Sequence, residues 1–180
     1  MWKYVKQKWK ERKGFGSIEI VLSAMIVLMM VGGMLDMISI TQRFETVSQA
    51  TNYVSRIVQK QGGVRTSRID NYNGKYTTSA TLYNNVKDMM ESNGIHEEDW
   101  TLTLTLPDGK SYTVTPTTNV PIVNYGQRMK VTISVNYRWN IVSTMLPIQG
   151  ERTRDSIKEV LSGYQSRQTS DMKTTLGAES

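Results

Sequence analysis

The sequence predicts an α+β protein in which a long N-terminal membrane-spanning helix continues into an amphipathic half and is followed by a small antiparallel sheet with one extra helix. Three patterns support this class. An apolar run long enough to cross a bilayer lies near the N-terminus. A stripe of apolar residues at helical spacing follows it, and further along the chain threonines alternate with large apolar residues.

The positive charge of the chain is concentrated at its N-terminus. The 180 residues carry a formal net charge of +6. The first fourteen contain six basic side chains against one acid, Glu11, and so carry +5, which leaves +1 for the other 166. Because a nucleic-acid-binding domain gathers basic residues on a folded face, we expect no nucleic-acid partner. The chain has no cysteine, which excludes disulfides, thiolate nucleophiles and cysteine-based metal sites.

Residues 18–40 are predicted to form a transmembrane helix. About twenty residues at about 1.5 Å each cover the hydrocarbon core of a bilayer, and the run between Glu19 and Asp36 is uncharged. The basic leader before it should stay in the cytoplasm by the positive-inside rule. We therefore predict one membrane pass, with the chain outside from about Ser39 onward.

The helical pattern continues beyond the apolar run with a different surface. Apolar residues and one threonine recur at spacings of three and four, at Ile40, Phe44, Val47, Thr51, Val54 and Val58. This spacing predicts a narrow buried stripe on an amphipathic helix, and Gly62-Gly63 supplies a stop. A helix from about Ser17 to Gln61 would be about 65 Å long at about 1.5 Å per residue.

A loop, a second helix and a hairpin are predicted next. Residues 62–77 are rich in Gly, Arg, Asn and Ser and predict a loop, and residues 80–92 predict a helix capped by Asn93-Gly94. From Trp100 to Leu106 large apolar residues alternate with threonine, which indicates a half-buried strand. The turn at 107–109 and residues 112–114 predict a return strand.

The C-terminal third is predicted to complete the sheet. Residues 116–127 predict a loop, and residues 129–141 predict a strand with alternate positions on one face. Residues 148–164 fit either an edge strand or a helix. We favour the strand because a sheet needs a polar edge. The tail 165–180 has no apolar spacing and is predicted to be disordered.

The most informative segment joins the leader to the apolar run and reads Lys13-Gly14-Phe15-Gly16-Ser17-Ile18-Glu19. A carboxylate such as that of Glu19 is costly in an apolar helix unless it is paired, so an ionisable group at this place is itself a functional hypothesis. Snorkelling toward the headgroups is the alternative explanation.

This segment resembles the processing site of type IV prepilins. The resemblance implies that a prepilin peptidase removes residues 1–14 by cutting after Gly14, and that Phe15 becomes the new N-terminus, usually N-methylated. Glu19 is then the fifth residue of the mature chain. It would pair with the α-amino group of an adjacent subunit and set the axial register of the helices. A cut after Gly16 would leave Glu19 third, which does not fit the family pattern.

The resemblance covers about the first 60 residues, and it also implies partners. These are other pilin-like subunits, an assembly ATPase and its membrane platform protein, besides the lipid bilayer. The short leader, the threonine-rich sheet and the lack of cysteine resemble TadE-type pseudopilins or pilin-like proteins of conjugative elements. Many major pilins carry a C-terminal disulfide loop that this chain cannot form, so the choice between major and minor subunit stays open.

Other candidate residues have simpler alternatives. Gly32-Gly33 in mid-helix predicts either tight helix packing or a point where the helix stretches or bends. Asp36 is an interface residue or has a role in assembly. The methionines between Met25 and Met37 indicate adaptable packing. His96 lies beside three acids, 97–99, in a predicted solvated loop, with a cation site as the alternative.

The sequence therefore predicts no catalytic residues, no metal site, no cofactor and no enzymatic activity. We expect four parts: leader 1–14, helix 15–61, an extracytoplasmic α+β domain 62–164 and the tail. The expected function is that of a structural subunit of a type IV or Tad-like pilus or pseudopilus, for secretion, adhesion or conjugation. It would be anchored in the bacterial cytoplasmic membrane and reach the cell surface after assembly. The alternatives are a non-polymerising single-pass protein with an extracytoplasmic binding domain, and a secreted enzyme cut near Gly33 by signal peptidase.

Overall fold

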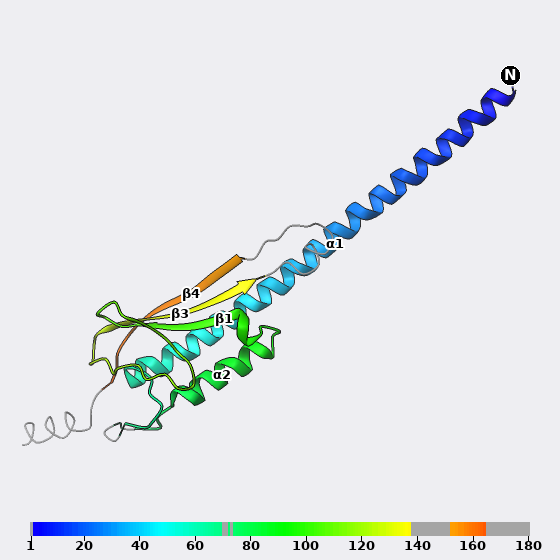
Figure 1. Cartoon of the computed structure of the whole chain (residues 1–180). Helices are drawn as coiled ribbons and strands as arrows, with labels where there is room; N and C mark the ends of the chain where they lie inside the picture. Colours follow the sequence, from blue (N-terminus) through cyan, green and yellow to red (C-terminus); the bar gives the residue numbers. More distant parts are fainter. Residues whose placement is uncertain (1, 70–71, 73, 138–151, 165–180) are drawn as a thin grey trace, which may run out of the picture. The chain divides into compact units, whose positions relative to one another are not determined.

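The computed structural model describes residues 2–69, 72, 74–137 and 152–164, with side chains from Gly16 onward. The helices and strands are α1 Trp2–Gln61, α2 Ser79–Glu91, the short 3₁₀ helix η1 Glu97–Asp99, β1 Trp100–Thr105, β2 Ser111–Thr113, β3 Arg128–Tyr137 and β4 Arg152–Leu161 (Figure 1). The predicted α+β class is confirmed: a long apolar N-terminal helix, one further helix and a four-stranded antiparallel sheet.

Helix α1 begins earlier than the sequence suggests. We expected a start near Ser17, but the helix already begins at Trp2 and passes through Gly14 and Gly16 without interruption. The expected start was wrong because the leader, although highly charged, consists mainly of Lys, Gln, Glu and Arg, whose helix propensities are close to that of alanine. The expected end at Gln61 is confirmed, and Gly62 follows it with a φ of +71°.

Contacts divide the chain into two compact units, of which the second comprises 41–137 and the residues from Arg152 onward. The boundary between Ile40 and Thr41 is where the predicted transmembrane run ends. The second half of α1 therefore belongs to the compact unit, where it contributes its buried face. Val54 and Val58 on that face are fully buried, and Thr51 is 2% exposed, as the stripe predicts.

The sheet of the second unit has the strand order β2-β1-β3-β4. The register pairs Leu102 with Ile133 in β1 and β3, and both side chains are buried. Threonines of β1 alternate with these apolar positions and stay more exposed. The predicted hairpin is confirmed, with Thr105 opposite Ser111. Residues 138–141 of the third predicted strand and the tail 165–180 lie outside the described residues.

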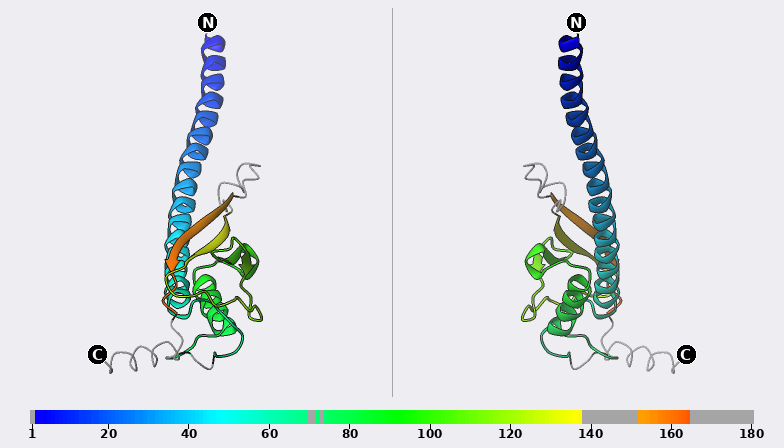
Figure 2. Two further views of the ribbon diagram at one scale, coloured as in Figure 1. Left: turned by 90° about the vertical axis from the view of Figure 1, so that its left-hand side faces the viewer. Right: turned by 90° about the vertical axis from the view of Figure 1, so that its right-hand side faces the viewer.

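Strand β4 settles the ambiguous C-terminal segment in favour of the predicted edge strand. It pairs with β3 along its whole length, from Arg128 opposite Leu161 to Tyr137 opposite Arg152. It also contacts α1, because Thr51 Oγ1 lies 2.9 Å from Ser156 Oγ. The sheet thus lies against the C-terminal half of α1, as the two views of Figure 2 show.

Helix α2 lies beside the C-terminal half of α1 (Figures 1 and 2). Asn85 Nδ2 donates to Tyr53 Oη of α1 at 2.6 Å. The predicted C-terminal cap is confirmed, since Gly94 has a φ of +69° and its N–H donates to the Glu91 carbonyl at 3.0 Å. The Ile95 N–H donates to the Met90 carbonyl, which completes a Schellman motif.

The N-terminus of α2 gives a first testable prediction. Thr78 is the N-cap, and its Oγ1 accepts from the Thr81 N–H at 3.3 Å. Replacing Thr78 with alanine should lower the free energy of unfolding by about 1 kcal/mol, because one N–H of the first turn loses its partner. Urea unfolding of the full-length chain in detergent measures this loss. Thr78→Ser keeps the hydroxyl and should stay close to wild type; equal stability of the two variants would refute the capping role.

Candidate functional site: the apolar segment of helix α1

The first half of α1 exposes apolar side chains over most of its circumference. Between Ile18 and Ile38 the large apolar residues are 50% to 71% exposed, except Met29, which is half-buried. Consecutive positions such as Ile20, Val21 and Leu22 are all exposed, and consecutive residues on a helix point about 100° apart. A soluble protein does not leave a contiguous apolar surface of this size uncovered. This segment therefore has to be covered by lipid or by other helices.

Within the described residues, α1 is the one helix that is long and apolar enough to cross a membrane. Only 6% of its most apolar eighteen-residue stretch is buried. A core helix of a soluble protein is mostly buried, so this explanation does not fit α1. The segment is compatible with a membrane-spanning helix near the N-terminus.

The residues of the predicted processing site lie close together on α1. Gly14 and Phe15 are within the helix, and Glu19 follows Phe15 by four positions, which is about one turn. Glu19 is exposed, and none of the hydrogen bonds or ion pairs of the described side chains involves it. The carboxylate is thus available to a group from outside the chain, and it lies among exposed apolar residues.

Gly32, Gly33 and Asp36 share one face of α1, because positions three and four apart are neighbours on a helix. Gly32 is buried, Gly33 is half-buried and Asp36 is 5% exposed. In contrast, the neighbouring Leu35 and Met37 are 52% and 67% exposed. The helix runs unbroken through the two glycines. The missing side chains at positions 32 and 33 allow close approach of another segment at this face.

The acids next to His96 form η1, directly before β1. Glu97 accepts hydrogen bonds from Lys87 Nζ and, at 2.8 Å, from Tyr83 Oη of α2. The Lys87 and Tyr83 hydrogen bonds lower the pKa of Glu97. In the part of the chain that the structure describes, no group of three potential ligands is arranged for a metal ion. Glu97 instead joins η1 to α2.

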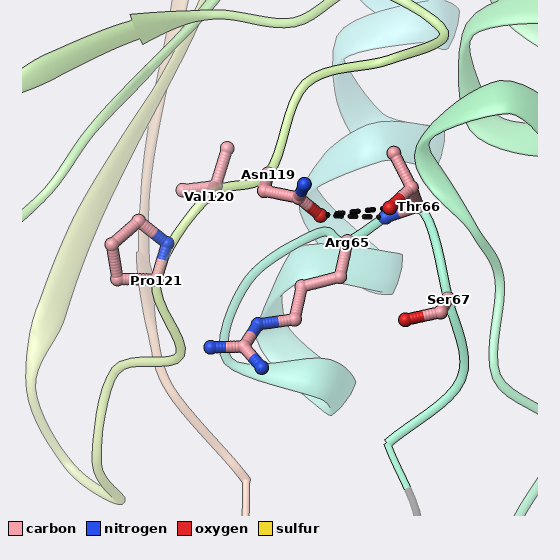
Figure 3. A pocket seen from close by; sticks show the side chains of 6 residues that line it. All are labelled: Arg65, Thr66, Ser67, Asn119, Val120 and Pro121. Carbon is pink, nitrogen blue, oxygen red and sulfur yellow. Dashed lines mark hydrogen bonds between the residues drawn. The ribbon is translucent and has the colours of Figure 1, made fainter.

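One open pocket of about 390 Å³ lies between the loops that follow α1 and β2. Figure 3 shows its six lining residues, Arg65, Thr66, Ser67, Asn119, Val120 and Pro121. Asn119 Oδ1 accepts from both the N–H and the Oγ1 of Thr66, at 2.9 and 3.0 Å. The Val120 N–H donates to the Val64 carbonyl at 2.7 Å. These bonds hold the two loops together, and no local pattern in the sequence predicts them.

Comparisons with protein-family models, curated proteins and solved structures find no match to this chain.

Proposed function

We propose that the protein is a structural subunit of the type IV pilin-like class and not an enzyme. Prepilin peptidase removes residues 1–14, and an assembly ATPase with its platform protein moves the mature chain from the membrane into a filament or pseudopilus. One observation carries this proposal. Glu19 has no partner within the described chain, lies in an apolar helix and is one turn from the chain end that a cut after Gly14 would create.

The physical reason for polymerisation is the exposed apolar surface together with this carboxylate. Lipid covers the surface of 18–38 before assembly, and neighbouring helices cover it afterwards. The free α-amino group of Phe15 is a cation that pairs with Glu19 of a neighbouring subunit, so that both charges leave water together. The compact unit that begins at Thr41 then lies outside the helical core of the polymer.

The continuous helix also suggests how the peptidase reaches its bond. Gly14 and Gly16 lie in α1, and each glycine lowers helix stability by about 1 kcal/mol relative to alanine. The helix therefore unwinds more easily here than in residues 2–13 or in the glycine-free part of the apolar run, residues 17–31. A peptidase needs such an opening, because a helical peptide bond is not accessible to a protease cleft.

The intact mass of the mature chain, purified from cells with a working prepilin peptidase, tests the processing. We expect a chain that begins at Phe15, with a methyl group on its N-terminus. Gly14→Ala or a bulkier Gly14→Val should block trimming. Gly16→Ala is the matched control: it stabilises the helix by about as much as Gly14→Ala, and an added Cβ at Gly16 meets nothing within 4 Å. It leaves the residue before the cut unchanged and should therefore still be trimmed.

Three outcomes would contradict the proposal. A chain that still begins at Met1 indicates a single-pass protein that is not processed. A chain that begins at Gly33 or Met34 indicates a signal peptide. Trimming of Gly14→Val at the wild-type rate would show that the cut lies elsewhere.

A further inference from the structure

Three arginines gather at the end of the second unit where its part of α1 begins. Arg43 lies on α1, and Arg152 and Arg154 lie at the start of β4. Tyr137 and Val135 of β3 are their pairing partners in the register of the sheet, so the two arginines of β4 share the inward face of the sheet with these residues. We call this group of three the basic seam.

Aromatic contacts hold the basic seam in place. The Arg154 guanidinium carbon lies 4.6 Å from the centroid of the Phe44 ring, which is within the range of a cation–π contact. The Phe44 ring in turn lies 4.9 Å from the ring of Tyr137. Arg154 is therefore held over Phe44, which follows Arg43 in the sequence. Helix α1 and strands β3 and β4 meet at this point.

Tyr137 provides a second observation at the same place. Its side chain is 5% exposed, and its buried hydroxyl has no hydrogen-bond partner in the described structure. Burial raises the pKa of Tyr137, while the charges of Arg154 and Arg43 lower it. Buried polar groups almost always have a partner, so the hydroxyl of Tyr137 marks a place where the described contacts leave a polar group unsatisfied.

The positive charge of the basic seam is not balanced by acids of the described chain. The ion pairs among the described residues involve Lys87 and Lys110 but none of the three arginines. Asp155 is the acid of β4 that follows Arg154 directly in the sequence. Because successive side chains of a strand point to opposite faces of the sheet, Asp155 points away from Arg154. The basic seam thus offers three guanidinium groups to an anion.

The position of Arg43 identifies the source of this anion. Arg43 follows Ile40, the last apolar residue of the predicted transmembrane run, by three positions, which is less than one helical turn. The phosphate groups of a bilayer lie just outside its hydrocarbon core. We propose that the basic seam binds the phosphate of an anionic phospholipid in the outer leaflet of the membrane and so holds the compact unit against the surface before assembly.

This inference rests on the membrane insertion of α1 that the proposed function includes. Guanidinium groups are suited to the role because they bind phosphate through two parallel hydrogen bonds. Each arginine near an anionic membrane surface should increase the preference for an anionic lipid by about fivefold. Loss of two arginines should therefore reduce this preference by about twenty-five-fold.

The test uses the full-length protein in nanodiscs of phosphatidylcholine with a minority of phosphatidylglycerol. Native mass spectrometry after mild extraction counts the two lipids that stay bound. We expect wild type to retain phosphatidylglycerol preferentially, and Arg43→Gln/Arg154→Gln to lose this preference. Arg56→Gln/Arg128→Gln removes two exposed arginines outside the basic seam and is the matched control, which should keep it.

Two further variants separate lipid binding from folding. Arg154→Lys keeps the charge and should retain most of the preference. Arg152→Gln changes an exposed side chain and should lower the preference by about fivefold. Circular dichroism confirms that each variant is folded.

An unchanged lipid ratio in Arg43→Gln/Arg154→Gln, or an equal loss in the control, would overturn the inference. Displacement of the lipid by excess inorganic phosphate would also overturn it, because the basic seam would then be a site for free phosphate. A chain that resists alkaline extraction from membranes but shows no lipid preference contradicts only this inference. A chain that alkaline extraction releases contradicts the proposed function as well.

Discussion

Replacing Glu19 with alanine should leave the mature protein in the membrane and remove it from filaments. The variant loses the carboxylate that pairs with the new N-terminus, so a neighbouring α-amino group enters the apolar interior without a partner. A charge of this kind costs about 2.5–3.5 kcal/mol in a membrane helix. Every subunit contact loses this amount, so the equilibrium constant for adding one subunit should fall by about a hundredfold.

Shearing of cells followed by immunoblotting of filament and membrane fractions measures this effect. Glu19→Gln keeps the shape of the side chain but not its charge, and it should fail in the same way. Ile18→Ala is the matched control, since Ile18 is an exposed neighbour on α1 whose truncation removes apolar area and no charge. Filaments of Glu19→Ala in wild-type amounts would rule out the charge pair as the source of register.

Replacing Gly62 with alanine should give the largest loss of stability in the compact unit. Gly62 ends α1 with a φ of +71°, a conformation that costs other residues about 1–2 kcal/mol. An added Cβ would also lie 2.7 Å from the Val123 carbonyl oxygen and 2.7 Å from Tyr164 Cβ. The Val123 N–H donates to the Gly62 carbonyl at 2.8 Å, so the backbone of Val123 cannot move away without losing this bond.

The expected loss for Gly62→Ala is about 2–5 kcal/mol, the sum of the backbone cost and the cost of overpacking. This is a large part of the 5–15 kcal/mol that stabilises a typical domain. Denaturant unfolding of the full-length chain, followed by tryptophan fluorescence, measures it. Gly109→Ala is the matched control, because Gly109 has a φ of +82° but open space around its Cα. Equal losses for the two variants would show that the contacts of the added Cβ with Val123 and Tyr164 do not lower the free energy of unfolding.

Parts of the candidate site could be read from consecutive residues alone. The apolar run indicates a helix long and apolar enough to cross a membrane, because its signal is the composition of about twenty neighbours. Gly14, Phe15 and Glu19 are candidates because their spacing resembles that of a prepilin processing site. The basic seam gave no such signal, because Arg43 and Arg154 come from distant parts of the chain and meet only when β4 packs against α1. Tyr137 was expected on the buried face of its strand, but its unpaired hydroxyl depends on the residues that surround it.

The sequence by itself determined the end of α1, the bounds of α2 to within one residue, the alternation of β1 and the hairpin that follows it. Each of these depends on a local period or a turn residue. Only the tertiary structure decided that 152–161 is a strand. Ile157 and Leu161, whose spacing also fits a helix, are both 52% exposed in the strand, so the apolar pair that suggested a helix does not belong to the core. Pairing with β3 gives the backbone N–H and C=O groups of both strands their hydrogen-bond partners. Because β3 lies outside the segment 152–161, a local pattern within that segment cannot predict this pairing.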